Sequence, residues 1–198
     1  MKHAGIIAVG HYVPSKKLTN ADLEKMVDTT DEWIVTRTGI KERRIAAEHE
    51  KTSHLAIEAA REALHNAKIP PLKIELIIVA TTSPDSSFPS VACLVQKALG
   101  IKNAVAFDVS AACAGFVYAL STAHQFLLAG NYKNVLVIAA DRLTTMIDWQ
   151  DRGTCVLFGD GAGACVLQAS QREGILSEHL ESFGEYGALM QVIAPETR

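Results

Sequence analysis

The chain has 198 residues, 48% of them hydrophobic, which is enough apolar material for one buried core and for one domain or slightly more. Its net charge of −3 argues against nucleic acid as the main partner, because phosphate binding requires a basic face. No run reaches the roughly 18 apolar residues of a membrane span, and the start MKHAGIIAVGHYVP is too short and too interrupted for a signal peptide. We therefore expect a cytoplasmic protein without a membrane segment.

The first part of the chain predicts one strand and two helices. Gly5 to Val9 is a short apolar run typical of a strand, and Leu18 to Val27 predicts a short helix. Thr29 and Glu32 have the spacing of a capping box, which predicts a second helix that ends at Gly39.

Two side chains of this second helix stand out. Trp33 and Arg37 are four residues apart, so they share one helix face. From the residues alone, Trp33 is a packing residue, and Arg37 belongs to a solvated basic surface with Lys41, Arg43 and Arg44.

The next elements are a helix and a strand that are both buried. Thr52 or Ser53 caps the helix, whose alanine- and leucine-rich stripe runs to Ala67 before two prolines. Ile74 to Ala80 is an unbroken apolar run that predicts a buried strand.

A helix follows the polar loop TTSPDSSF. Pro89 can occupy its first turn, and Gly100 ends it. Phe88 stands at the mouth of this helix, where it could act as a hydrophobic staple.

Cys113 lies at the turn from a predicted strand, Val105 to Val109, into a predicted helix, Phe116 to Leu128. Unpaired N–H groups in a first helical turn favour a thiolate, although the helix contributes at most about 2 kcal/mol and a nearby base or cation is still required. The alternative is a small core residue. The four cysteines, at 93, 113, 155 and 165, form no CxxC pair and no zinc spacing, which favours free thiols and no metal site.

Asn134 to Ala140 predicts another buried strand, and an irregular polar loop continues to Gly153. Within that loop, Arg152 could simply form a surface salt bridge.

The glycine-rich stretch GDGAGA resembles a nucleotide loop only superficially. A dinucleotide fingerprint needs a helix after it, whereas Ala164 to Ala169 predicts a strand. We expect the glycines to form a tight connection between strands at Thr154 to Phe158 and Ala164 to Ala169. Ile175 to Ser182 predicts the start of a further strand, and Gly184 to Arg198 a loop.

The alternating elements predict an α/β fold with a mixed, mainly parallel sheet. The segments VSAACAGFVYAL and DRGTCVLFGDGAGA resemble beta-ketoacyl-acyl-carrier-protein synthase III, the condensing enzyme that starts fatty acid biosynthesis. This resemblance implies the thiolase-like fold, which has two pseudo-symmetric halves. Residues 1–170 would be the N-terminal half, and residues 171–198 would begin the second half with a mobile loop.

The resemblance also implies the roles of several residues. Cys113 would be the acyl-accepting nucleophile. The segment DEWIVTRTGIKERRI is similar to the coenzyme A segment of the family, in which Trp33 would stack on the adenine and Arg37 would lie near the phosphates. Thr29 would be a weaker polar contact, and Arg152 would pack across the adenine from the tryptophan.

Phe88 would cross the interface of a homodimer and line the partner subunit's acyl pocket. The family's catalytic histidine and asparagine have no counterpart among these residues, and none of the seven histidines lies in an Asn-His-Gly-like setting. We therefore expect the chain to be part of a longer protein.

The expected reaction condenses acetyl-CoA, or another short acyl-CoA, with malonyl-acyl carrier protein. Coenzyme A is then a substrate, and no cofactor is permanently bound. The alternatives are a 3-hydroxy-3-methylglutaryl-CoA synthase, a chalcone-synthase-like polyketide synthase, or a catalytically incomplete half that only dimerises and binds coenzyme A.

Overall fold

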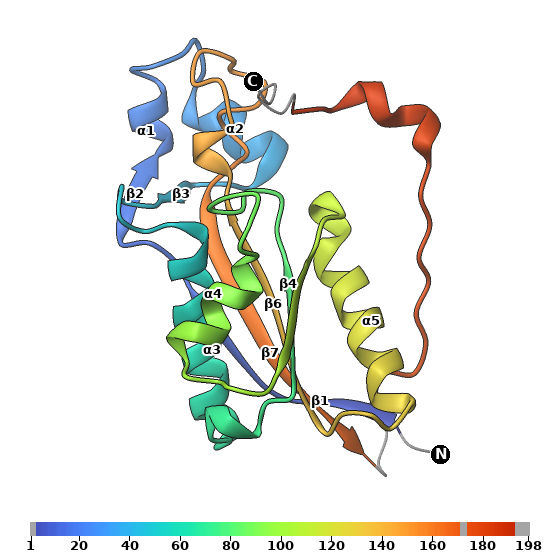
Figure 1. Ribbon diagram of the computed structural model, residues 1–198. Coiled ribbons are helices and arrows are strands. Elements are labelled where there is room, and N and C mark those ends of the chain that lie inside the picture. Colours follow the sequence, from blue (N-terminus) through green and yellow to red (C-terminus); the bar gives the residue numbers. More distant parts are fainter. Residues whose placement is uncertain (1–2, 171–173, 193–198) are drawn as a thin grey trace.

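The computed structural model describes residues 3–170 and 174–192 (Figure 1). Its centre is a five-stranded sheet in the order β1-β7-β6-β4-β5. The strands are β1 (His3–Tyr12), β4 (Leu76–Ala80), β5 (Val105–Val109), β6 (Asn134–Arg142) and β7 (Asp160–Ser170). Strand β4 pairs in parallel with β5 and β6, whereas β7 is antiparallel to β6 and β1. Only β7 therefore opposes the others, and the predicted mixed, mainly parallel sheet is confirmed.

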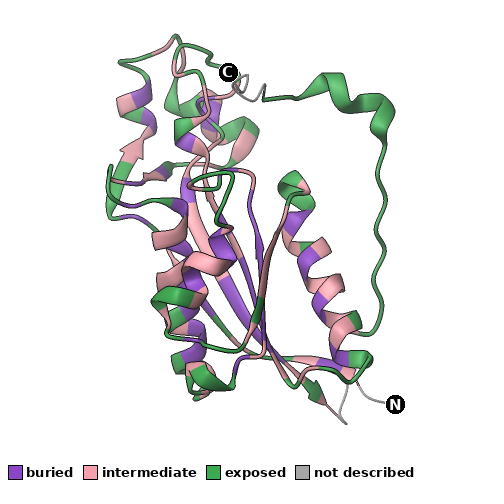
Figure 2. Cartoon of the chain, in the orientation of Figure 1, coloured by how far each residue is buried: buried purple, intermediate pink, exposed green. Residues whose placement is uncertain are grey.

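Helices cover both faces of this sheet (Figure 1). Helices α3 (Thr52–Ala67) and α4 (Val91–Ala98) pack on one face, and α5 (Gly115–Leu128) packs on the other. In β4, Ile77 and Val79 face the first layer while Leu76 and Ile78 face the second. A strand that is covered on both sides has no solvent face, which is why β4 is an unbroken apolar run and is buried throughout (Figure 2).

A smaller lobe extends from one end of the sheet. It contains the two-stranded sheet of β2 (Lys16–Thr19) and β3 (Glu42–Ile45), the helices α1 (Asn20–Leu23) and α2 (Asp31–Thr38), and the segment 143–159. Its own buried core is formed by Leu23, Ile34, Cys155 and Val156. Short 3₁₀ turns occur at Pro71–Lys73, Ala112–Ala114, Leu143–Thr145 and Gly184–Leu189. Within the described ranges, no helix combines the length and apolar character needed to cross a membrane.

Several helix boundaries differ from the prediction. The expected helix Leu18–Val27 is wrong at both ends, because Leu18 pairs with Arg43 in the small sheet, Thr19 caps α1 through Asp22, and α1 already ends at Leu23. Helix α2 is capped by Thr30, not by a Thr29 capping box. The N-cap residue of α3 is Lys51, not the expected Thr52 or Ser53. The N-cap residue of α4 is Ser90, so Pro89 lies outside this helix and not in its first turn.

The expected strand Thr154–Phe158 is also wrong. Asp151 forms a turn there instead, because its carboxylate accepts from the Gly153 N–H at 2.8 Å and the Thr154 hydroxyl at 2.7 Å. The GDGAGA glycines are therefore not a connection between two strands, since Gly161 and Gly163 already lie in β7. That a strand follows them is confirmed.

No strand forms between residues 175 and 182. This stretch runs along the outer side of α5 and is mostly exposed (Figures 1 and 2). Tyr118 donates to the Glu181 carbonyl at 3.2 Å, and Gln125 donates to the Glu178 carboxylate at 3.0 Å. Only the first residue of this stretch bonds to a strand, through the Ile175 N–H and the Ala4 carbonyl of β1 at 2.9 Å, and side chains of α5 contact the later residues.

Candidate active site

Cys113 occupies a short turn between β5 and α5, as predicted, and it is exposed. The preceding Ala112 has φ of +46°, a left-handed conformation that is costly for a residue with a Cβ atom. Gly115 starts α5 so close to β4 that an added Cβ would lie 3.2 Å from the Cβ of Ala80. The turn is therefore held against the carboxyl end of the parallel strands, with its thiol accessible.

The first turn of α5 has no side-chain cap, since its N-cap residue is Ala114. N–H groups at an uncapped helix start can donate to an anionic oxygen. An oxyanion that forms beside Cys113 would meet such donors.

The other cysteines are less suited to react. Burial raises the pKa of Cys165 to about 12. Burial, followed by the nearby Asp151 carboxylate, also raises the pKa of Cys155, and Arg43 only partly opposes this. Cys93 is half-buried. Of the four cysteines, Cys113 is the exposed one. The alternative that Cys113 is a small residue of the buried core is therefore wrong.

Asp141 organises the loop beside this turn, a role that the sequence did not reveal. One of its carboxylate oxygens accepts from the N–H groups of Thr82 at 2.8 Å and Ser83 at 3.2 Å. The same oxygen accepts from the hydroxyls of Thr81, Thr82 and Ser83 at 2.9–3.1 Å. Because β4, β5 and β6 are parallel, this carboxylate and Cys113 share one edge of the sheet. Asp141 thus holds the loop that follows β4 at this end of the sheet.

A second group of side chains forms in the small lobe. The guanidinium carbon of Arg37 lies 5.0 Å from the centroid of the Trp33 ring, and that of Arg152 lies 4.9 Å from it. The shared helix face of Trp33 and Arg37 is confirmed, and the fold adds Arg152 from 115 residues further along the chain. Arg152 also forms the surface ion pair considered above, with Asp28 at 3.6 Å. The result is an aromatic ring flanked by two cations.

Two further predicted site residues behave differently. The Thr29 hydroxyl is buried and has no hydrogen-bond partner in the described part of the chain. Phe88 is 85% exposed, so it does not act as a hydrophobic staple.

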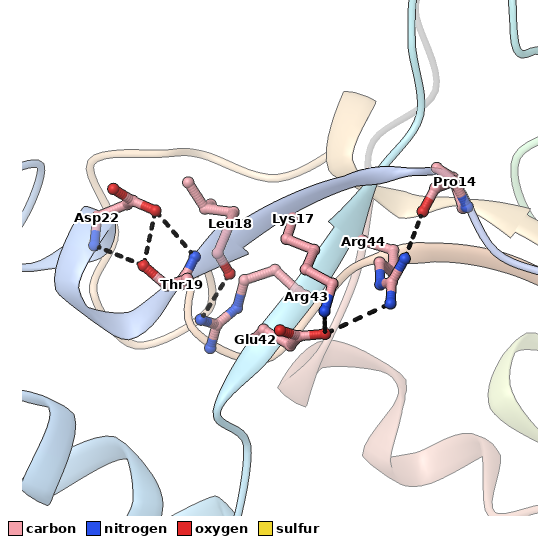
Figure 3. A network of polar contacts seen from close by, with 8 residues as sticks. All are labelled: Pro14, Lys17, Leu18, Thr19, Asp22, Glu42, Arg43 and Arg44. Atoms are coloured by element: carbon pink, nitrogen blue, oxygen red, sulfur yellow. Dashed lines mark hydrogen bonds and ion pairs between the residues drawn. The ribbon is translucent and has the colours of Figure 1, made fainter.

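The structure corrects the solvated basic surface at Arg43. This residue is only 4% exposed, and its neighbour Arg44 donates to the Pro14 carbonyl at 3.0 Å (Figure 3). Arg43 therefore belongs to the interior of the small lobe.

Comparisons with known proteins agree with this architecture. Residues 107–184 match the family model described as 3-oxoacyl-[acyl-carrier-protein (ACP)] synthase III. A beta-ketoacyl-[acyl-carrier-protein] synthase III of Bacillus anthracis is 55% identical over 186 residues, which are 93% of this chain and 60% of that protein. The chain thus spans about three fifths of the length of the curated relatives it matches.

Solved structures extend the agreement to the fold. A 3-oxoacyl-[acyl-carrier-protein] synthase III from Aquifex aeolicus VF5 superposes with a TM-score of 0.83 at 57% identity, over 85% of this chain and 55% of that chain. A 3-oxoacyl-(acyl carrier protein) synthase III from Pseudomonas aeruginosa PAO1 reaches a TM-score of 0.93 at 36% identity, over 98% of this chain and 61% of that chain. By sequence and by fold, the chain is therefore similar to beta-ketoacyl-acyl-carrier-protein synthase III over most of its own length, and its α/β fold is thiolase-like.

Proposed function

We propose that the protein starts fatty acid chains by condensing an acyl-CoA, such as acetyl-CoA, with malonyl-acyl carrier protein, and that Cys113 is the nucleophile. The exposed thiol of Cys113 on a turn that leads into an uncapped helix is the observation that carries this proposal. The relatives named above are synthases of this type, which favours this reaction over 3-hydroxy-3-methylglutaryl-CoA and chalcone-type synthesis.

The first stage is acyl transfer. The Cys113 thiolate attacks the thioester carbonyl carbon, a new carbon–sulfur bond forms, and coenzyme A leaves as its thiolate. Backbone N–H groups at the start of α5 would stabilise the tetrahedral oxyanion. A base must first remove the thiol proton. The family resemblance assigns no such base to this sequence.

In the second stage, decarboxylation of the malonyl group yields a carbanion that attacks the acyl-cysteine. The β-ketoacyl carrier protein, carbon dioxide and the free thiolate are the products. The enolate oxygen needs hydrogen-bond donors, which the resemblance assigns to a histidine and an asparagine without counterparts here. Residues 1–170 would then form the N-terminal half of the thiolase-like fold, and residues 171–198 would begin the second.

Coenzyme A would bind at Trp33, Arg37 and Arg152, with Thr29 as a further polar contact. Arg152 lies 4.9 Å from the Trp33 ring centroid, which leaves no space for a second ring between them. An adenine that stacks on Trp33 must therefore displace Arg152 outward, to pack on the other side of the base. The exposed ion pair with Asp28 opposes this shift only weakly.

Phe88 suits a role at the interface of a homodimer, because a phenylalanine with 85% of its surface exposed gains apolar contact on association. In that role it would line the partner subunit's acyl pocket. We place this homodimer in the cytoplasm.

Intact-mass measurement before and after incubation with acetyl-CoA tests the nucleophile. We expect one acetyl adduct on the wild type and on the Cys93→Ala control, and none on Cys113→Ala. An adduct retained by Cys113→Ala overturns the assignment. If the chain takes up acetyl without condensing it, and adding the missing half restores condensation, it is a catalytically incomplete half.

The same labelling tests the coenzyme A site. Trp33→Ala and Arg152→Ala should each raise the acetyl-CoA concentration needed for half-maximal labelling, without changing alkylation of Cys113 by iodoacetamide. Unchanged saturation curves in both variants would remove these residues from the site.

A further inference from the structure

The small lobe contains a buried arginine, Arg43, that is hydrogen-bonded to Asn20 and to the Val156 carbonyl, in the segment that follows Arg152. Arg43 lies on β3, and Figure 3 shows its guanidinium directed toward the Leu18 carbonyl of β2, at 3.5 Å. Its stronger bonds go elsewhere: one terminal nitrogen donates to the side-chain oxygen of Asn20 at 2.7 Å, and the other donates to the Val156 carbonyl at 2.6 Å. The guanidinium therefore joins two segments that are far apart in the sequence.

On one side, Asn20 connects Arg43 to α2, the helix that carries Trp33. Asn20 does so through its amide group. Its side-chain nitrogen donates to the Asp31 carboxylate at 2.7 Å and to the Ile40 carbonyl at 2.8 Å. Asp31 is the first residue of α2, and Ile40 lies just beyond its last residue, Thr38. Both ends of α2 are thus held by one amide.

On the other side, the Val156 carbonyl connects Arg43 to the segment that carries Arg152. Val156 is buried four residues beyond Arg152, past the turn that Asp151 stabilises. Gly159 permits the close approach of this segment to β3, because an added Cβ would lie 3.1 Å from the Arg44 carbonyl oxygen. The hydrogen bond from Arg43 to Val156 therefore holds the chain four residues beyond Arg152 against β3.

Burying the positive charge of Arg43 costs desolvation free energy. Burial lowers the pKa of Arg43, and in the described part of the chain none of the ion pairs involves this guanidinium. Its hydrogen-bond acceptors are two backbone carbonyls and one amide, so their geometry and not a counter-charge defines its place. A buried charge without an ionic partner adds little net stability, which points to a role in specifying an arrangement.

We propose that Arg43, together with Asn20, is a positioning residue that holds the Arg152 segment beside α2, so that Arg152 covers Trp33 in the free protein and stays within reach of an adenine that enters between them. The adenine part rests on the proposed function, whereas the placement of Arg152 does not. The planar guanidinium can donate in two directions at once, which a lysine ammonium on a flexible stem reproduces poorly.

The first test needs no ligand. In a Trp149→Phe background, Trp33 is the single remaining tryptophan, and acrylamide quenching reports how far its ring is covered. Arg152→Ala should increase quenching, and Arg43→Met should increase it by the same amount. Arg43→Lys and Asn20→Ser, which disturb the network less, should give smaller increases.

Leu64→Ala on α3 is the control, because it opens a cavity in the core between α3 and the central sheet. It should lower the thermal midpoint without affecting the small lobe. We expect wild-type quenching in this control. Wild-type quenching in the Arg43 and Asn20 variants, or an equal increase in Leu64→Ala, would overturn the proposal.

The second test measures binding of coenzyme A by calorimetry. The Kd should rise about tenfold in Arg43→Met, as expected if Arg152 is no longer placed to make one charge-assisted contact with the nucleotide, and should not change in Leu64→Ala. An unchanged Kd in Arg43→Met overturns the adenine part. If the wild type binds no coenzyme A while Arg43→Met still increases quenching, the proposed function fails and the positioning of Arg152 stands.

Discussion

Replacing Gly10 by alanine should disrupt the packing of α3 on the central sheet. Gly10 lies on β1, and a Cβ added to it would be 2.3 Å from the Ala63 nitrogen and 2.5 Å from the Ala59 carbonyl oxygen. Both are backbone atoms of α3, so no side chain can rotate away. The helix and the strand must separate instead.

The structure sets the size of this effect. Relieving such contacts requires a shift of about 1 Å, and a gap of that size forfeits a quarter to a half of the dispersion energy along the contact. Overpacking of this kind costs about 1–3 kcal/mol, and a clash with rigid backbone belongs at the upper end. Alanine regains about 0.5–1 kcal/mol relative to glycine in a strand. We therefore expect a net loss of about 2 kcal/mol, or roughly 4–8 °C in thermal midpoint for a chain of this size.

Gly5→Ala is the matched control on the same strand. Its added Cβ would lie 3.6 Å from the Cβ of Ser170, an ordinary contact, so its stability should equal or slightly exceed that of the wild type. Urea denaturation followed by circular dichroism measures both variants. If Gly10→Ala and Gly5→Ala unfold at the same urea concentration, the close approach of α3 to β1 is not as described.

Three further predictions follow from individual side chains. Burial raises the pKa of Cys165 to about 12, above an unfolded value near 8.5, so stability is lost as the pH rises between these values. From pH 8 to 10 the wild type should lose about 2 kcal/mol more than Cys165→Ala in urea denaturation, and equal losses would contradict this. Thr30→Ala should lower unfolding free energy by about 1 kcal/mol, because Thr30 caps α2, whereas Thr29→Ala should cost less; the reverse order would restore the capping box. Iodoacetamide should alkylate Cys113 before Cys155 and Cys165 in the native chain, as peptide mapping can show; labelling of either buried thiol at the same rate would refute this.

Predictions of local structure succeeded where one segment contains the whole signal. The apolar runs of β4 and β6 identified these strands, because strands covered on both faces are apolar along most of their length, whereas the alternation of Val105, Phe107 and Val109 identified the edge strand β5. Helix α5 was identified by its spacing and by the glycine that follows it. The position of Cys113 between β5 and α5 follows from these two elements.

Local patterns failed where a distant segment competes for the chain. Leu18 was expected in a helix but pairs with Arg43 in a small sheet, since β3 offers backbone partners 25 residues away. Thr154 was expected in a strand, but the side chain of Asp151 captures it in a turn. Periodicity in one segment carries no information about such competitors.

The sequence by itself determined the layered α/β architecture, the turn that presents Cys113 and the shared helix face of Trp33 and Arg37. Only the tertiary structure decided that Arg152 closes on Trp33 and that Arg43 is buried between Asn20 and Val156. The reason is physical: helix and strand signals depend on neighbours within a few residues, whereas a hydrogen bond between residues 43 and 156 exists only once the intervening chain has folded.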